Sequence, residues 1–374
     1  MSETEAGEPG GLAGQVTATL VAAGYPRVEP PVLQPAQVFL DQSGEDIRGR
    51  LYLTSDASGA EFCLRPEYTI PVCRAYLASP QAGAEAAFSY AGPVFRVRPG
   101  QSGEFAQAGL ESFGRPDAEA ADAEILALAL EAAAAAGLAE PQVLIGDAGL
   151  VAAFLEALAL PPVWLRRLRR GLMRGRSLAE IFAPAANGRE HDHSGVLAAL
   201  EGVDRQGARA LVEDLLSIAG IAAVGGRTAG EIAERFLEQS ATRSGPPVGA
   251  EQRAALDRFF AVRGDPDQAS ADLRGLADDA GLDIAAALDS LDARTGFLAA
   301  RGVDVGRLDF AAAFHRNLDY YTGFVFEARD PRRADGKPVI GGGRYDRLLR
   351  TLGAKADIPA VGAAIWLDRL GGAA

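Results

Sequence analysis

The sequence predicts an α+β fold, in which an antiparallel sheet core with flanking helices is interrupted by a helical insertion. Strand-like segments lie towards both ends of the chain, without the regular alternation of strand and helix that builds a parallel sheet. Between residues 151 and 299 the strand signals disappear, and Ala, Leu, Arg and Glu recur at helical spacing. We therefore expect a core made of residues 1–150 and 300–374, with 151–299 as the insertion.

The first expected elements are a helix and an extended segment. Leu12, Val16 and Leu20 recur every four residues, which is typical of an amphipathic helix, and Gly24 marks its end. Residues 25–33 (YPRVEPPVL) should be extended because their prolines are incompatible with a helix interior.

Two hairpins should follow. Residues 51–65 predict two short strands around a turn at 56–59, whose sequence is DASG. Residues 88–97 and 105–113 are also strand-like and are joined by a polar loop, which predicts a second and longer hairpin.

An alanine-rich helix and a strand complete the first part of the core. Pro116 and Asp117 are typical of a helix start, and Gly137 of a helix end. The apolar run at 142–145 predicts a short strand.

The last part of the chain predicts a strand at 318–329, a glycine-rich turn at 341–343, a short helix at 345–352 and a final helix at 360–370. The glycine-rich turn resembles a phosphate cradle, but it lacks the Lys-Ser/Thr pair of a P-loop. A purely structural turn before a helix is an equally good interpretation.

Charge and hydropathy exclude some classes of function. The chain holds 37 basic and 50 acidic residues and has a net charge of −13, which argues against nucleic-acid binding because phosphate neutralisation supplies most of that affinity. Residues 164–176 hold six arginines, and we interpret them as a solvated helix face, with a protein contact as the second interpretation. The sequence contains no uncharged apolar run of about 18 residues, so we expect no membrane span.

The cysteines and histidines predict no metal site and no disulfide framework. We expect Cys63 and Cys73 to be buried thiols, and His191 and His193 to lie in a solvated loop rather than to bind a metal. Residues 1–10 are acidic and lack the features of a signal peptide, so we expect a cytoplasmic protein. No sequence motif calls for a cofactor.

Polar residues with ligand-binding character lie on two predicted strands. Strand periodicity places Gln107, Gly109 and Glu111 on one face, where the glycine would leave a gap for a small ligand. A solvated outer face is the alternative for such a pattern taken alone. If the preceding segment is extended, Glu67 and Thr69 also share a side.

The second strand strengthens the ligand-binding interpretation. On a regular strand Tyr321, Gly323, Val325 and Glu327 share a face, and Arg316 lies just upstream. Together these residues supply carboxylates, hydroxyls and a guanidinium group. That combination suits a free amino acid, whose ammonium would meet a carboxylate and whose carboxylate would meet an arginine.

These segments, in this order, resemble the class II catalytic core of histidyl-tRNA synthetases. The resemblance covers nearly the whole chain except the middle. The matching segments are residues 25–33 (motif 1), 64–69 (LRPEYT), 95–96 to 113–114 (motif 2 and its next strand), 316–323 (RNLDYYTG, where the family has RGLDYY), and 342–346 with 359–370 (motif 3).

The resemblance implies a set of histidine-binding positions. It assigns the histidine contacts to Glu67, Thr69, Gln107, Glu111, Tyr320, Tyr321 and, more weakly, Tyr345, and it matches Arg316 to the arginine that serves activation in the synthetases. Since Tyr320 and Tyr321 would face opposite sides of a regular strand, the two assignments are in tension.

Three departures from the family argue against aminoacylation. The motif 2 loop, which begins at Arg96, is short and lacks the expected glutamate and the late arginines that would hold ATP. Motif 3 normally carries G-x-x-x-G-x-x-R on a helix, where this chain has Gly362, Trp366 and Arg369. The indole should fill the nucleotide space, which makes Arg96, Trp366 and Arg369 a degenerate ATP site. Five residues follow Arg369 (374 − 369 = 5), so we expect no anticodon-binding domain.

Within this family, the profile resembles the non-catalytic regulatory subunits of the short-form ATP phosphoribosyltransferase. The resemblance implies a homodimer formed through motif 1, assembled with the separate catalytic subunit into a hetero-oligomer. It also implies that L-histidine binds and transmits feedback control, without nucleic acid, membrane or cofactor. The alternatives are a histidyl-tRNA synthetase lacking the anticodon domain and a stand-alone histidine-binding module.

Overall fold

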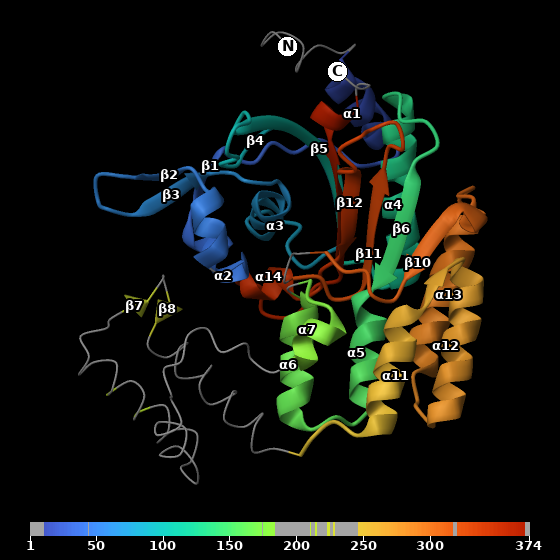
Figure 1. Ribbon diagram of the computed structural model, residues 1–374. Helices are drawn as coiled ribbons and strands as arrows, with labels where there is room; N and C mark the ends of the chain where they lie inside the picture. The colour runs from blue at the N-terminus through green and yellow to red at the C-terminus, as the bar shows by residue number, and fades with distance from the viewer. Residues whose placement is uncertain are drawn as a thin grey trace. The chain divides into compact units, whose positions relative to one another are not determined.

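The computed structural model describes residues 11–43, 45–173, 175–183, 246–316 and 320–370, with a few isolated positions between 210 and 228 (Figure 1). The predicted loop with His191 and His193 and the acidic tail at 1–10 lie outside the described residues. The chain divides into two compact units, one made of Met1–Ala157 and Arg258–Ala374 and the other of Leu158–Asp257. The second unit is smaller than the expected insertion because residues 151–157 and 258–299 group with the core.

The N-terminal elements agree with the sequence-based expectation. Helix α1 spans Leu12–Ala22 and buries Val16 and Leu20. A small antiparallel sheet follows, in the order β1-β3-β2. Its turn is held by the Asp56 side chain, which accepts hydrogen bonds from the N–H groups of Ser58 and Ala60. The bounds here are Leu33–Pro35 (β1), Gln37–Ser43 (α2), Glu45–Arg50 (a 3₁₀ helix), Leu53–Ser55 (β2), Glu61–Leu64 (β3) and Thr69–Leu77 (α3).

The main sheet has eight strands in the order β4-β5-β13-β12-β11-β6-β10-β9. Strands β6 and β10 are parallel, and every other neighbouring pair is antiparallel, as the fold class requires. The bounds are Ala86–Phe95 (β4), Glu104–Phe113 (β5), Gln142–Asp147 (β6), Arg263–Gly264 (β9), Leu308–Ala311 (β10), Phe324–Arg329 (β11), Pro338–Arg344 (β12) and Ala360–Trp366 (β13).

Two predictions for the C-terminal part are wrong. The expected turn at 341–343 lies inside strand β12, and the expected helix at 360–370 is strand β13 followed by a 3₁₀ helix, Leu367–Arg369. The alanines of β13 favour a helix locally, but pairing with β5 and β12 places the segment in the middle of the sheet. A Cβ on Gly342 would overlap the Gly362 carbonyl, so glycine allows these two strands to approach closely.

Helices cover one face of the sheet. Helix α4 (Ala118–Ala135) packs on β5, β12 and β13, and α13 (Ala285–Ala300) packs on α4. A buried ion network joins these layers: Arg294 of α13 bonds to Asp122 at 2.9 Å and to Asp147 at 2.8 Å, and Arg344 of β12 bonds to the other oxygen of Asp122. Sequence patterns did not predict this network, because its members lie far apart in the chain.

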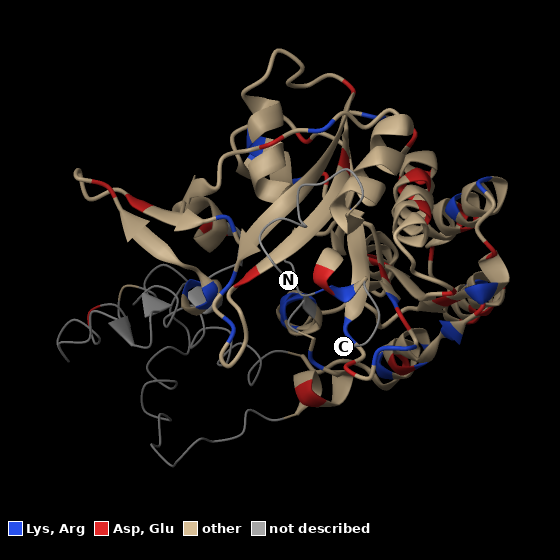
Figure 2. Ribbon diagram, turned by 90° about the horizontal axis from the view of Figure 1, so that it is seen from above, with Lys and Arg blue, Asp and Glu red and all other residues tan. Residues whose placement is uncertain are grey.

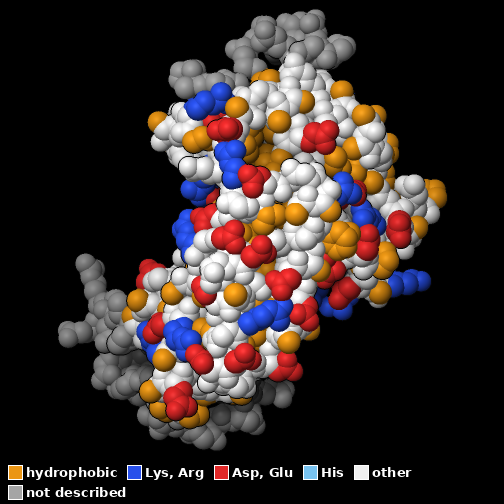
Figure 3. All heavy atoms as spheres, turned by 90° about the vertical axis from the view of Figure 1, so that its right-hand side faces the viewer, with side chains coloured by type: hydrophobic (Ala, Val, Ile, Leu, Met, Phe, Trp, Pro, Cys, Tyr) orange, Lys and Arg blue, Asp and Glu red, His pale blue; other side chains and the backbone are white. Residues whose placement is uncertain are grey.

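The outer helices carry paired surface charges. Helix α12 spans Pro266–Ala280, and its Arg274 pairs with Asp289 and Asp292 of α13. Figures 2 and 3 show acidic and basic residues interspersed over this part of the molecule. No described helix is long and apolar enough to cross a membrane. The short helix α14, Leu348–Thr351, lies beside α3.

The second unit contains the arginine-rich segment. Its described helices include α6 (Pro162–Met173) and α7 (Leu178–Phe182), while α5 (Ala148–Ala157) and α11 (Ala250–Ala261) adjoin its boundaries. Trp164 stacks on Phe182 with ring centroids 5.0 Å apart, and Arg167 donates a hydrogen bond to the Ala183 carbonyl. At least one arginine of this segment therefore stabilises its own unit.

Candidate functional site

The sheet face opposite α4 is lined by glycines. Antiparallel register aligns them across neighbouring strands: Gly362 lies opposite both Glu111 and Gly343, and Gly341 lies opposite Glu327. Where side chains are missing, side chains from neighbouring segments can lie flat against the backbone. The glycines of this face are Gly92, Gly109, Gly146, Gly341, Gly343 and Gly362.

The protein's own polar side chains occupy the space above these glycines. A Cβ on Gly362 would overlap the Glu111 carboxylate, and a Cβ on Gly341 would overlap the Arg316 guanidinium. The predicted ligand gap at Gly109 is wrong, because the Tyr90 hydroxyl fills that space. The glycines thus allow these polar side chains to lie against the sheet and do not themselves form a pocket.

Glu111 lies at the centre of the predicted histidine-binding residues. It is fully buried, accepts a hydrogen bond from the Thr69 hydroxyl at 2.9 Å, and accepts another from the Tyr345 hydroxyl. Burial raises the pKa of the Glu111 carboxyl to about 8. The site therefore holds a carboxyl whose charge is readily stabilised by an added cation or hydrogen-bond donor.

Glu67 and Thr69 do not lie on an extended segment as expected, because Thr69 starts helix α3. The Glu67 carboxylate accepts hydrogen bonds from the N–H groups of Thr69 (2.6 Å) and Ile70 (3.0 Å), which need partners at a helix N-terminus. Burial raises the pKa of Glu67, while the nearby charge of Arg96 opposes this rise. Arg96 is fixed by a hydrogen bond of 2.6 Å from its Nε to the Pro66 carbonyl.

Tyr320, Tyr321 and Tyr345 form one aromatic group. The ring centroid of Tyr320 lies 5.0 Å from that of Tyr321 and 5.8 Å from that of Tyr345. The two consecutive tyrosines precede β11, which begins only at Phe324, so strand alternation does not separate them. The predicted strand face of Tyr321 and Gly323 is therefore wrong, but both tyrosines reach the site. Residues 317–319 of the same motif lie outside the described residues.

Trp366 lies close to two arginines, Arg316 and Arg369. The indole is 7% exposed, lies opposite Gln107 in the pairing of β13 with β5, and has Arg369 over its ring at 4.6 Å. The guanidinium of Arg316 lies 6.0 Å from the same ring. Although the predicted helix is a strand, Gly362 and Trp366 still share a face, because a spacing of four is even.

Three buried polar atoms of these residues have no hydrogen-bond partner. They are Gln107 Oε1, Arg316 Nε and Trp366 Nε1, and they make up half of the six such atoms among the described residues. Buried polar atoms are normally paired, so three such atoms on these residues indicate a partner from outside the chain, which can be a water, an ion or a ligand.

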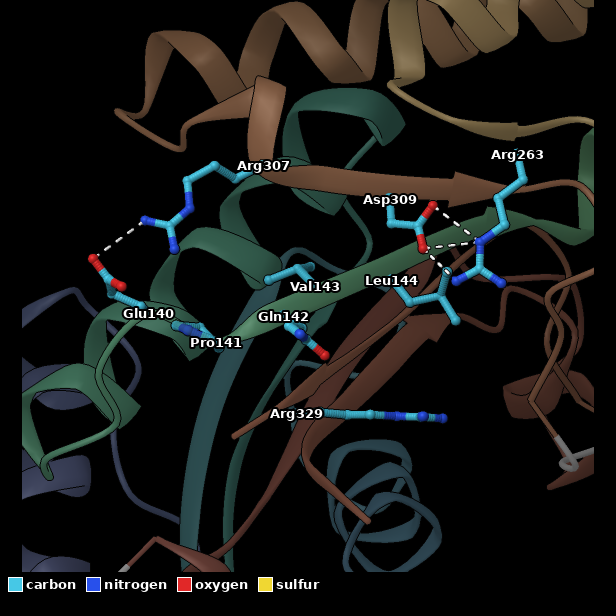
Figure 4. A pocket seen from close by; sticks show the side chains of 9 residues that line it. All are labelled: Glu140, Pro141, Gln142, Val143, Leu144, Arg263, Arg307, Asp309 and Arg329. Carbon is cyan, nitrogen blue, oxygen red and sulfur yellow. Dashed lines mark hydrogen bonds and ion pairs between the residues drawn. The ribbon is translucent and has the colours of Figure 1, made fainter. Parts of the chain in front are cut away.

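An open cleft of about 420 Å³ lies elsewhere on the core (Figure 4). Its three arginines are matched by carboxylates: Arg263 pairs with Asp309 at 2.5 Å and Arg307 with Glu140 at 3.7 Å, and Arg329 bonds to Glu327. The cleft contains none of the predicted binding residues. Its lining is Glu140, Pro141, Gln142, Val143, Leu144, Arg263, Arg307, Asp309 and Arg329.

Metal binding has no support in the part of the chain that the structure describes. No group of three or more His, Cys, Asp or Glu side chains there is arranged to hold an ion. Cys63 and Cys73 are both buried free thiols, as predicted.

Comparison with known proteins identifies the family. The family model described as histidyl-tRNA synthetase matches residues 2–370. The chain is 40% identical over 369 residues to a protein of Brucella anthropi named ATP phosphoribosyltransferase regulatory subunit, and 41% identical to one of the same name from Mesorhizobium japonicum. Each alignment covers 96% of both chains.

The fold comparison agrees. A crystal structure described as an ATP phosphoribosyltransferase regulatory subunit/histidyl-tRNA synthetase from Bacillus halodurans has a TM-score of 0.67 at 23% identity, covering 96% of this chain and 77% of that one. The predicted class II synthetase-like α+β fold is thereby confirmed. The chain belongs to the histidyl-tRNA synthetase family, on the branch of the ATP phosphoribosyltransferase regulatory subunits.

Proposed function

We propose that this chain binds L-histidine and controls the separate, short-form catalytic subunit of ATP phosphoribosyltransferase without catalysing a reaction itself. One observation carries the proposal: two of the predicted histidine contacts, Thr69 and Tyr345, bond to a third, Glu111. The indole at position 366, where motif 3 of the family has a glycine, is buried. The names of the relatives support the regulatory role.

The site suits the three polar parts of histidine. Glu111, with Tyr345 and Thr69 beside it, offers a carboxyl for an imidazole N–H or an ammonium group. Glu67 offers a second carboxylate, fixed at the start of α3. Arg316 offers a guanidinium for the ligand carboxylate, since only one carboxylate, Glu327 at 3.7 Å, lies within ion-pair range among the described residues.

The same region is poorly suited to ATP. Trp366 is packed among buried aromatic and aliphatic residues, so its ring occupies space on the sheet where a nucleotide would need open backbone. In the short motif 2 loop, Arg98 folds back, stacking on Phe105 at 4.1 Å and donating to the Ser102 carbonyl at 2.9 Å. Arg98 is therefore engaged within its own hairpin.

A homodimer is the proposed form of the regulatory subunit. Five large apolar side chains are exposed on the small sheet and beside it, each by 37–48%, and apolar patches of this kind are typical of protein interfaces. Leu33 and Tyr52 share one face of this sheet, because both lie opposite Leu64 of β3, whereas Leu53 lies opposite Cys63 and points to the other face. The Val97 N–H bonds to the carbonyl of Arg50, which precedes Tyr52 by two residues. The patch, here called the small-sheet patch, consists of Val32, Leu33, Tyr52 and Val97.

Reconstitution with the catalytic subunit tests the proposal. The two purified proteins should co-elute in size-exclusion chromatography, the mixture should form phosphoribosyl-ATP faster than the catalytic subunit alone, and histidine should inhibit the mixture. Histidine-dependent exchange between ATP and pyrophosphate by this chain alone would favour the truncated synthetase instead. Histidine binding without any effect on the catalytic subunit would favour a stand-alone module.

A further inference from the structure

Trp366 carries a donor that the rest of the protein does not satisfy. The side chain is only 7% exposed, and its Nε1 is buried without a hydrogen-bond partner. An indole N–H can only donate, so it requires an acceptor. Arg369 and Arg316, the charged groups over the ring, are donors too and cannot supply one. Gln107, opposite Trp366 on β5, has an acceptor in its amide oxygen, but this oxygen does not bond to the indole and is itself without a partner.

The surroundings of the indole indicate the chemistry of the missing acceptor. The Nε of Arg316 is also unpaired. The Arg316 guanidinium lies over Gly341 of β12, and β13 separates β12 from β5, the strand of Gln107. Unpaired N–H donors on an arginine and on a tryptophan, with a second guanidinium at 4.6 Å from the ring, favour an anion. A carboxylate has enough lone pairs to accept from both residues.

The distance to Glu111 suits one amino acid. Trp366 lies opposite Gln107, and Glu111 follows Gln107 by four residues on β5, which is about 13 Å of strand. The Glu111 carboxylate lies over Gly362, and the Arg316 guanidinium lies over Gly341, which is opposite Ala364, halfway between Gly362 and Trp366 along β13. A ligand bound beside Arg316 would thus have a carboxyl on one side and the indole on the other.

We infer that Trp366 is a ligand-binding residue whose indole N–H, together with Arg316, holds the free carboxylate of the bound amino acid. The inference rests on the proposed function and adds a selectivity to it: the site requires an unmodified carboxylate. Esters and amino alcohols of the same side chain should bind weakly, because they lack the charge that both donors need. Trp366 then has two effects, since it excludes a nucleotide and recognises the group that a synthetase would activate.

Calorimetric titration of a ligand series tests this assignment. Wild-type protein should bind L-histidine at least 10-fold more tightly than L-histidinol or L-histidine methyl ester, a factor typical of one lost hydrogen bond to a charged group. Trp366→Phe keeps a ring but removes the N–H. It should weaken histidine binding about 10-fold and leave histidinol binding within 2-fold. Equal weakening of both ligands would overturn the inference, because a ring that only shapes the site would act on both alike.

The tryptophan content of the chain allows a second measurement that does not depend on that variant. The sequence holds two tryptophans, and Trp164 lies in the other compact unit, stacked on Phe182. In a Trp164→Phe protein, the emission of Trp366 alone should change with histidine and saturate at the calorimetric affinity, and histidinol at a saturating concentration should cause a smaller change. Unchanged emission at saturating histidine would overturn the inference.

The failure of this inference differs from the failure of the proposed function. If wild-type protein binds no histidine in calorimetry, both are contradicted. If it binds histidine, but histidinol equally well, only the role of Trp366 and of the carboxylate is contradicted. Thermal unfolding of Trp366→Phe without ligand should remain cooperative, which shows that the variant is folded in the titration.

Discussion

Glu111 and Gly362 lie directly opposite each other on strands β5 and β13, and the carboxylate of Glu111 occupies the space that a side chain at position 362 would need. The absence of a side chain at position 362 thus leaves room for the central carboxyl of the candidate site. This dependence links the glycine-lined sheet face to the proposed histidine site.

Gly362→Ala should therefore displace the Glu111 carboxylate from its position on the sheet. The added methyl group would displace Glu111 and strain two strands, which we expect to cost about 1–3 kcal/mol of unfolding free energy and to weaken histidine binding at least 10-fold. Gly296→Ala is a matched control, because it lies within α13 with no atom within 4 Å of the new Cβ. It should be neutral or stabilising in urea unfolding and should bind histidine normally. Equal effects of both substitutions would contradict this account.

The pKa of Glu111 predicts a pH dependence of stability. Its folded-state pKa is raised to about 8 from an ordinary value of 4.5, so the protonated form is favoured by folding. The contribution to stability is complete below about pH 4.5 and is lost as the pH rises through about 8. Glu111→Gln removes this loss. The unfolding free energy of this variant in urea, minus that of the wild type, should increase from pH 5 to pH 8. A difference that stays constant over this range would show that the pKa of Glu111 is not raised.

The same substitution should weaken histidine binding. A neutral amide can still accept a hydrogen bond, but it cannot compensate a positive charge, so we expect a loss of about 10–100-fold in affinity. Wild-type protein at pH 7 should also release protons on binding, because a cationic group lowers the pKa of Glu111. Calorimetry in two buffers of different ionisation enthalpy measures this release. Binding without proton exchange would place the ligand cation away from Glu111.

The buried ion network should be important for stability. Arg294→Met leaves Asp122 and Asp147 without the guanidinium that pairs with both, and breaking a buried pair typically costs about 3–5 kcal/mol. Arg274→Met removes a similar pair of bonds to Asp289 and Asp292 on the exposed helix surface, where about 0–1 kcal/mol is typical. Urea unfolding compares the two variants, and similar losses would contradict the distinction between buried and exposed pairs.

The small-sheet patch should be required for dimer formation. Leu33→Lys places a charge in the patch and should shift sedimentation from dimer to monomer. Val21→Lys is the control, since Val21 is as exposed as Leu33 (48% each) but lies on α1, outside the patch. A dimer that survives Leu33→Lys, or a wild-type monomer, would contradict the proposed interface.

Much of the fold could be predicted from local patterns. The α1 helix, the two hairpins and α4 follow from periodicity, turn residues and helix-end signals. Strand β13 could not, because Ala, Gly and Val at 360–364 have no strong local preference, and pairing with β5 and β12 determines their conformation.

The local geometry of the candidate site residues could be predicted only in part. Period two correctly placed Gln107 and Glu111 on one face of β5, since that segment is a regular strand. It failed for Thr69 and Tyr321, because the first begins a helix and the second precedes its strand. The unpaired Nε1 of Trp366 could not be inferred from sequence at all, because it depends on which atoms surround the indole.

Differential thermal unfolding of the wild-type chain tests the central claim most directly. A ligand that binds only the folded state stabilises it by RT ln(1 + [L]/Kd), and therefore raises the melting temperature. We predict that millimolar L-histidine raises the melting temperature by several degrees, while ATP with Mg²⁺ at the same concentration leaves it unchanged. A rise with ATP and none with histidine would contradict the account of an amino-acid site beside a nucleotide position filled by Trp366.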